Sequence, residues 1–327
     1  MSIHGFGSLP DGRPVHRVVV GEPPGPVLHV LDLGATVHRL EVTGPDGVRR
    51  NVVLGLPTPE AYLAGSGYVG GTIGRYANRI AGGCFPLAGT QVRVGAHDRG
   101  NHLHGGPDGF DRRLWEVAEV AADRCQLVLH SPDGDQGFPG NLTARARFEV
   151  DEREVRLTLE AETDAPTVVN LTSHAYLDLG AGVVDHLRLQ VAADDYTPVG
   201  DTGIPRAGHE PVAGTRFDVR EPTRIGGTVL DHNLVLRGSG LRHVATLSAP
   251  ATGLQVELST DQPGLQVYTG DQLAAPLRPR AGIALEPQLF PDTPNRPDFP
   301  SATLRPGETY RSRIAWRFGP LSRRPPP

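Results

Sequence analysis

Residues 310–318 read Tyr-Arg-Ser-Arg-Ile-Ala-Trp-Arg-Phe and carry the clearest structural signal in the chain. Tyr, Ser, Ile, Trp and Phe occupy the even-numbered positions, and Arg or Ala occupies each odd-numbered one. A period of two residues is typical of a β-strand with one buried face and one solvated face. The stretch therefore predicts a long strand that packs one side against a core.

The same two-residue period recurs in other stretches along the chain, and turn signals separate these stretches. Pro132-Asp133-Gly134-Asp135 and Gly226-Gly227 are two of these turn signals. Only residues 59–63 suggest a helical turn, and no alternation of strands with helices points to a parallel sheet. We therefore predict an all-β protein, a large antiparallel β-sandwich, formed by one domain over residues 1–327 with a frayed tail at 323–327. The further alternating stretches are 125–129, 144–150, 155–161, 187–191 and 254–258.

Composition excludes several kinds of chemistry. All 32 basic residues of the 327 are arginines, so a lysine Schiff base, a pyridoxal phosphate enzyme and a Gly-Lys-Ser/Thr phosphate loop are ruled out. The 41 glycines and 31 prolines indicate many turns and few long helices. A net charge of −5 argues against nucleic acid as a partner.

Localisation follows from similar arguments. No apolar run is long enough to span a membrane, and residues 1–17 lack the apolar segment of a secretory signal. The two cysteines, Cys84 and Cys125, do not form a disulfide framework. We expect a cytoplasmic protein with two reduced thiols and no membrane partner.

Two motifs suggest a cofactor or a metal, each with an alternative. Residues 65–70 match Gly-x-Gly-x-x-Gly, but no buried strand precedes them and no helix pattern follows, so a nucleotide site is not expected. His102 and His104 are two residues apart, and on a strand both imidazoles would share one face and could bind one metal ion. No third ligand follows with suitable spacing. The alternative is that one histidine acts on an organic substrate and the other is incidental.

Four clusters of polar residues stand in turn-like segments where hydrophobic packing does not account for them: 74–80, 170–176, 231–233 and 285–288. The last of these places the Glu286 carboxylate at the end of an apolar run. Each cluster taken singly is compatible with a structural role, because buried polar groups often bond only to backbone. Together they supply planar amide, guanidinium and carboxylate groups for sugar hydroxyls, and aromatic rings for a sugar face. They also contain His174 and Glu286, which could transfer protons.

These clusters, in this order and spacing, resemble the aldose 1-epimerase (galactose mutarotase) family. The similarity covers about residues 30–317. The matching stretches are 33–36, 53–56, 74–85, 101–115, 131–142, 170–179, 195–198, 217–218, 231–233, 262–264, 268–270 and 286–295.

The resemblance implies a galactose mutarotase-like β-sandwich with an open sugar cleft, no metal and no cofactor. It implies interconversion of the α and β anomers of a free aldohexose, with a monosaccharide as partner and a monomer or homodimer as the assembly. The catalytic acid would be His174, the base Glu286 and a second pocket histidine His104, which makes His102 the incidental one. The substrate-binding positions would be Asn78, Arg79, Tyr176, Asp231 and Gln266.

Some questions stay open at the level of sequence. The mechanism requires Glu286 to begin ionised and His174 to begin protonated. Ser173, Ala175 and Pro287 depart from the usual residues of the family, and the segment between Gln266 and Glu286 is short; these departures bear on sugar preference. A non-catalytic sugar sensor on the same fold and an epimerase of hexose 6-phosphates are the two alternative functions.

Overall fold

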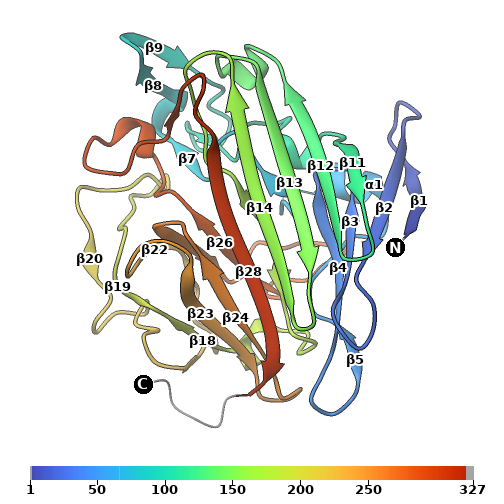
Figure 1. Cartoon of the computed structure of the whole chain (residues 1–327). Coiled ribbons are helices and arrows are strands. Elements are labelled where there is room, and N and C mark those ends of the chain that lie inside the picture. The colour runs from blue at the N-terminus through green and yellow to red at the C-terminus, as the bar shows by residue number, and fades with distance from the viewer. Residues whose placement is uncertain (1, 66, 322–327) are drawn as a thin grey trace.

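The computed structural model describes residues 2–65 and 67–321, and nearly all of its regular structure is β (Figure 1). The tail that we expected to be frayed, 323–327, lies outside the described residues. The largest sheet has nine strands in the order β11-β12-β13-β14-β28-β24-β23-β18-β21, every neighbouring pair antiparallel. Its strands are β11 (Glu116–Val120), β12 (Arg124–Ser131), β13 (Leu142–Val150), β14 (Glu154–Thr163), β28 (Tyr310–Pro320), β24 (Leu254–Thr260), β23 (Arg242–Ala249), β18 (Arg188–Val191) and β21 (Thr223–Arg224).

All six alternating stretches of the sequence belong to this one sheet. In β13 and β14 buried residues alternate with partly exposed ones over almost the whole strand, as predicted. In β28 the pattern holds except at Ala315, which is also buried. The long central strands β12, β13, β14 and β28 lie side by side in Figure 1. The prediction of a large antiparallel β fold is confirmed.

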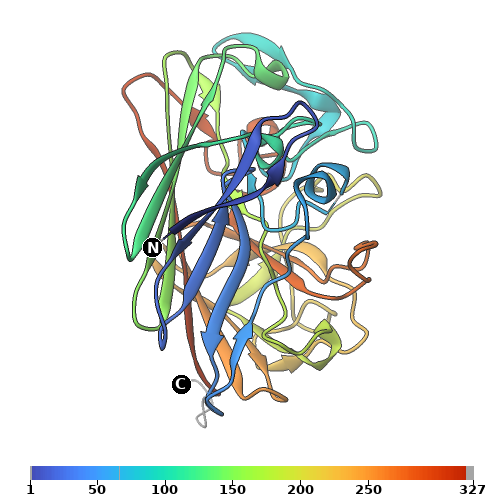
Figure 2. The same cartoon turned by 90° about the vertical axis from the view of Figure 1, so that its right-hand side faces the viewer.

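Two smaller sheets pack on the same core. The first has five strands in the order β1-β2-β3-β4-β5, and the second has six in the order β17-β26-β25-β22-β19-β20. Figure 2 shows β11–β14 and β28 along one side of the molecule and most of the remaining chain on the other. The five-stranded sheet comprises β1 (Ser2–Ser8), β2 (Pro14–Val20), β3 (Val27–Leu31), β4 (Thr36–Thr43) and β5 (Arg49–Asn51). The six-stranded sheet comprises β17 (Tyr176–Leu177), β26 (Ile283–Gln288), β25 (Gly264–Tyr268), β22 (Asp231–Leu236), β19 (Ala193–Tyr196) and β20 (Glu210–Pro211).

Short elements connect these sheets. The single α-helix of the described chain, α1 (Pro59–Ala64), confirms the predicted helical turn and is capped by the Thr58 side chain. Eight further short strands form four small pairs: β6 (Thr72–Ile73) with β16 (Thr172–Ser173), β7 (Arg79–Ile80) with β10 (His102–Leu103), β8 (Cys84–Leu87) with β9 (Thr90–Arg93), and β15 (Thr167–Val168) with β27 (Thr303–Leu304). The 3₁₀ turns are η1 (Ala81–Gly83), η2 (Phe110–Arg112), η3 (Asp135–Gly137), η4 (Val184–His186) and η5 (Thr293–Asn295).

The six-stranded sheet is covered on both faces, and this positions the site. In β26 all six residues are buried. Ile283 and Leu285 point into the main hydrophobic core, whereas Ala284 belongs to a separate cluster on the opposite face. Glu286 lies two residues beyond Ala284 and therefore shares that second face. A carboxylate is thus held at the end of an apolar strand, facing away from the core.

Candidate active site

The second face of the six-stranded sheet forms the floor of a cavity of about 470 Å³. All eight residues that the resemblance singled out line it. They come from six separate parts of the chain and meet only because of the strand pairing. They are Asn78, Arg79, His104, His174, Tyr176, Asp231, Gln266 and Glu286.

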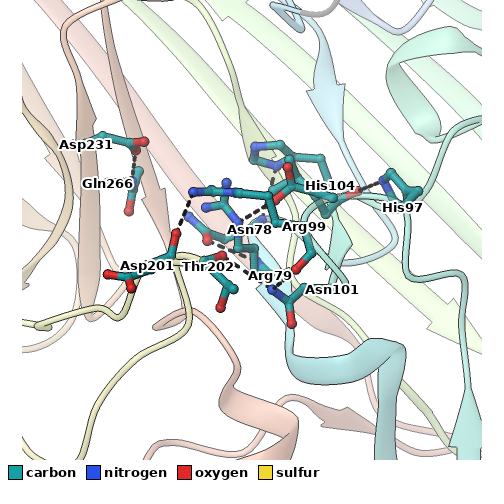
Figure 3. A network of polar contacts seen from close by, with 12 residues as sticks. Asn78, Arg79, His97, Arg99, Asn101, His104, Asp201, Thr202, Asp231 and Gln266 are labelled. Atoms are coloured by element: carbon teal, nitrogen blue, oxygen red, sulfur yellow. Dashed lines mark hydrogen bonds and ion pairs between the residues drawn. The ribbon is translucent and has the colours of Figure 1, made fainter.

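Strand register aligns the floor residues. Gln266 on β25 lies directly opposite Glu286 on β26, and its side-chain Nε2 donates to Oδ1 of Asp231 on β22 at 2.7 Å. Cross-strand neighbours on one face have Cβ atoms about 5 Å apart, so these polar groups form one continuous surface. Figure 3 shows Asp231 and Gln266 joined by this hydrogen bond.

His174 and Glu286 form the centre of the cavity. Nε2 of His174 lies 3.6 Å from Oε1 of Glu286, and both side chains are almost fully buried. Burial lowers the pKa of His174 to about 4 and raises the pKa of Glu286 well above its ordinary value. The nearby Asp231 carboxylate adds to the rise for Glu286, and Arg79 opposes it. The charged starting forms expected from sequence are therefore the ones that burial of the two side chains disfavours.

Two reciprocal hydrogen bonds connect His104 to the backbone of Asn78. The His104 amide donates to the Asn78 carbonyl at 3.1 Å, and the Asn78 amide donates to Nδ1 of His104, also at 3.1 Å. Because Nδ1 accepts a hydrogen bond, the proton of the neutral ring resides on Nε2. Burial, with a contribution from His174, holds the pKa of His104 well below its ordinary value. His104 is thus a fixed neutral donor.

His102 does not join this group. Strand β10 ends at Leu103, and His104 has a positive φ of 50°, which breaks the alternation on which the shared-face argument rested. Nδ1 of His102 lies 2.8 Å from the Gly95 carbonyl, and its ring packs edge-on against Phe138. The hypothesis of a metal held by both histidines is wrong.

A different trio could be considered for a metal. One donor atom each from His104, His174 and Glu286 lies within 4.8 Å of the others, among the described residues. Through Nε2, however, a neutral His104 offers a proton and no lone pair, since its other nitrogen is occupied by the Asn78 amide. The donor set therefore does not suit a divalent ion.

Aromatic rings line the remaining walls, and two of them, Tyr68 and Tyr268, were not among the residues expected from the sequence. Tyr68 lies with its ring centroid 4.6 Å from that of His104 and 5.7 Å from that of His174. It belongs to the glycine-rich stretch 65–70, whose described residues, 65 and 67–70, follow α1 and begin no helix. Tyr268 packs edge-on against Tyr176. Tyr268 stood in one of the matching stretches, so the resemblance could have indicated it; no signal marked Tyr68.

The loop between β25 and β26 also reaches the cavity. Gln272 and Leu273 line it, and the Gln272 amide donates to the Tyr268 hydroxyl at 2.8 Å. The short segment noted in the sequence is thus part of the wall. Three residues of the rim near Arg79 were likewise not anticipated: His97, Asp98 and Arg99.

A β-sandwich with a strand-lined cavity, planar polar groups on its floor and a buried carboxylate–imidazole pair at its centre defines a carbohydrate-converting enzyme of the galactose mutarotase-like fold. The chain belongs to the aldose 1-epimerase family, a family of isomerases, whose sequence pattern matches residues 17–317.

Several known proteins resemble this chain in sequence, in structure or in both. The aldose 1-epimerase of Escherichia coli is 36% identical, covering 94% of this chain and 96% of its own length. The human galactose mutarotase is also 36% identical, covering 96% and 97% respectively. The galactose 1-epimerase of Lactobacillus acidophilus superposes with a TM-score of 0.87 at 29% identity, covering 98% and 99%. An aldose epimerase homologue from C. elegans gives a TM-score of 0.90 at 27% identity, covering 94% and 99%.

Proposed function

We propose that this protein interconverts the α and β anomers of free aldohexoses such as galactose or glucose. The observation that carries the proposal is the buried His174–Glu286 pair, 3.6 Å apart, at the centre of a cavity lined by hydrogen-bonding groups. The whole chain would act as one domain with its core at about 30–317, as a monomer or homodimer in the cytoplasm, where Cys84 and Cys125 stay free thiols. None of the described helices is long and apolar enough to cross a membrane.

The reaction needs two proton transfers. Glu286 removes the proton from the C1 hydroxyl while His174 gives a proton to the ring oxygen. The bond between C1 and the ring oxygen breaks, and C1 becomes an aldehyde. Half a turn about the C1–C2 bond presents the other carbonyl face, and ring closure returns both protons to where they began.

His174 and Glu286 share one transferable proton throughout this cycle. The proton is on His174 before ring opening and on Glu286 after it, so the open-chain stage has an uncharged pair. Burial favours that uncharged pair, as the two opposite pKa shifts indicate. Burial of the pair thus lowers the energy of the ring-opened stage relative to the ion-paired one. The positive charge of Arg79, which favours ionised Glu286, acts in the opposite sense and keeps the starting form accessible.

His104 would assist as a hydrogen-bond donor. Its Nε2 proton can point to the oxygen on which negative charge develops, and a neutral donor that is already oriented costs no reorganisation. Asn78, Arg79, Tyr176, Asp231 and Gln266 would hold the ring hydroxyls and fix the ring oxygen near the acid. These roles extend the family assignment to single residues and are part of the proposal.

The charge of the cavity favours a free sugar over a sugar phosphate. Arg79 and Arg99 are its only lining cations among the described residues other than histidines, and Asp98 lies within 4.0 Å of both. Asp231 adds a further carboxylate. A phosphate group would find no excess of positive charge here.

Polarimetry on freshly dissolved α-D-galactose and α-D-glucose tests the activity. Glu286→Gln and His174→Asn should each lower the enzymatic rate by about 10²–10⁴-fold. Glu162→Gln and His130→Asn, which change the same residue types at exposed positions, serve as matched controls. Near-normal mutarotation in both site variants would refute the assignment, and sugar binding without mutarotation in the unaltered protein would favour a sensor. Competition by hexose 6-phosphates at low concentration would favour the phosphorylated substrate.

A further inference from the structure

Two tight turns from distant parts of the chain meet across the Arg79 side chain. The first, residues 98–101, is closed by two hydrogen bonds between Asp98 and Asn101, with N···O distances of 2.9 and 2.8 Å. Its central residues, Arg99 and Gly100, have φ values of 49° and 79°, as in a type I′ turn. The second turn, residues 200–203, is closed by the Gly203 amide donating to the Gly200 carbonyl at 2.9 Å.

Arg79 is held from its edge and from its face. Its Nε donates to Oδ2 of Asp98 at 2.7 Å, and the side chain is only 12% exposed. On the other side, a Cβ atom at Gly203 would lie 2.9 Å from Cζ of Arg79, so the backbone of the second turn rests on the guanidinium. Gly203 also has a φ of +79°, which favours glycine at this contact.

The two turns are bonded to each other directly. Nη1 of Arg99 donates to the Asp201 carbonyl at 3.1 Å, and Nδ2 of Asn101 donates to the Thr202 carbonyl at 3.3 Å. Figure 3 shows these bonds beside Arg79 and Asn78. The Asn101 side chain is also fixed by a hydrogen bond outside the two turns, because its Oδ1 accepts from the Gly82 amide at 3.0 Å.

A second, smaller cavity of about 140 Å³ adjoins the sugar cavity at this point. It shares Asn78, Arg79, Arg99, Asp231 and Gln266 with the main cavity, and its far wall includes Gly200 and Gly203. The guanidinium of Arg79 therefore lies between the main cavity and the second turn.

We infer that residues 98–101 and 200–203 form a clasp that fixes Arg79 for sugar binding, with Asp98 as its positioning residue. The inference rests on the proposed function and adds to it a cavity-lining residue that acts through Arg79. An arginine side chain left unrestrained loses several rotamers when a ligand orders it. A clasp that orders Arg79 beforehand removes this cost from substrate binding.

The effect should fall on KM. Asp98→Ala frees Nε of Arg79 and should raise KM by about 2- to 12-fold, the usual cost of ordering one long side chain. The kcat value should change by less than about 3-fold, because the acid–base pair is untouched and uniform binding does not enter kcat. Asp98→Asn keeps an acceptor for Nε and should raise KM less than Asp98→Ala does.

A double-mutant cycle separates this role from a merely structural one. In an Arg79→Ala background, Asp98→Ala should have no further effect on KM, because there is no guanidinium left to position. The matched control is Asp218→Ala, which removes a carboxylate bonded to Arg220 outside the cavity and should leave KM unchanged. Thermal unfolding of every variant confirms that each is folded under the assay conditions.

The outcomes are distinct. An unchanged KM in Asp98→Ala, or a full additional effect in the Arg79→Ala background, would overturn the clasp. If the unaltered protein binds sugar but does not catalyse mutarotation, the proposed function fails, and the same cycle is measured as sugar affinity by calorimetry. A cycle that is additive there would overturn the clasp as well, and absence of any sugar binding would overturn both.

Discussion

Arg75→Lys should destabilise this protein strongly, although it conserves charge. Arg75 is 2% exposed and uses each of its five N–H groups. Nε donates to Oγ of Ser131, Nη2 to the carbonyls of Ser131 and Pro132, and Nη1 to those of Phe138 and Pro139. The donor–acceptor distances are 2.8–2.9 Å for four of these bonds and 3.5 Å for the one to Phe138.

A lysine at this position has at most three donors, so two or more of the five acceptors lose their partner. Two of the five acceptors, the carbonyls of Pro132 and Phe138, keep a backbone donor from Asp135 and Gly134. The cost is therefore that of at least two lost hydrogen bonds to a charged group, about 1.5–3 kcal/mol each, which gives a loss of about 3–6 kcal/mol in the free energy of unfolding. Each kcal/mol lowers the melting temperature of a chain of this size by roughly 2–4 °C.

Urea unfolding followed by fluorescence, together with calorimetric melting, measures the loss. Arg311→Lys is the matched control, because its side chain is 57% exposed and bonds a glutamate on the surface; its change should stay within about 0.5 kcal/mol. An Arg75→Lys midpoint equal to that of the unaltered protein would refute the claim that this network of five hydrogen bonds requires a guanidinium.

The remaining predictions concern the active site. Because the pair needs one proton, kcat/KM should hold as pH falls from neutrality towards about 4, where His174 takes up a second proton, and should fall on the alkaline side as Glu286 loses its raised-pKa proton; a steep loss between pH 7 and 5 would contradict this. Gly105→Ala places a Cβ 1.7 Å from the Gly74 carbonyl oxygen and should displace His104, abolishing most activity, whereas Gly89→Ala, with a similar φ and nothing within 4 Å, should cost only about 1 kcal/mol of stability. Treatment with a chelator should leave the mutarotation rate unchanged, since His104 presents a proton to the cavity; loss of activity that is restored by added metal would reverse that conclusion.

The two-residue alternation of polarity in the sequence predicted only one of the three larger sheets, and the reason is physical. The nine-stranded sheet has a solvated face, so its strands alternate in polarity along the chain. The six-stranded sheet lies between the core and the cavity, and β26 is buried at every position. A strand covered on both faces does not alternate, and sequence periodicity could not detect it.

The resemblance to a family identified the site residues in the sequence. It did not identify which residues they contact in the folded protein. Glu286 and Gln266 stand in recognisable stretches of the sequence, but nothing there says that they face each other across two strands. Asp98 carries no signal at all, because its role depends on Arg79, 19 residues away, and on a turn more than a hundred residues later. Contacts of this kind depend on the register of paired segments, which a single sequence leaves open.

The sequence by itself determined that this is a turn-rich β protein without lysine chemistry, and it contained every group that the proposed reaction needs. Local alternation, glycine and proline carry that information because they act through neighbouring residues. The tertiary structure alone decided the state of the groups. Burial shifts the pKa values of His174 and Glu286 in opposite directions, an amide of Asn78 fixes the proton on His104, and two distant turns hold Arg79. Desolvation and non-local hydrogen bonds exist only once the strands have paired, and for that reason they cannot be read from the order of residues.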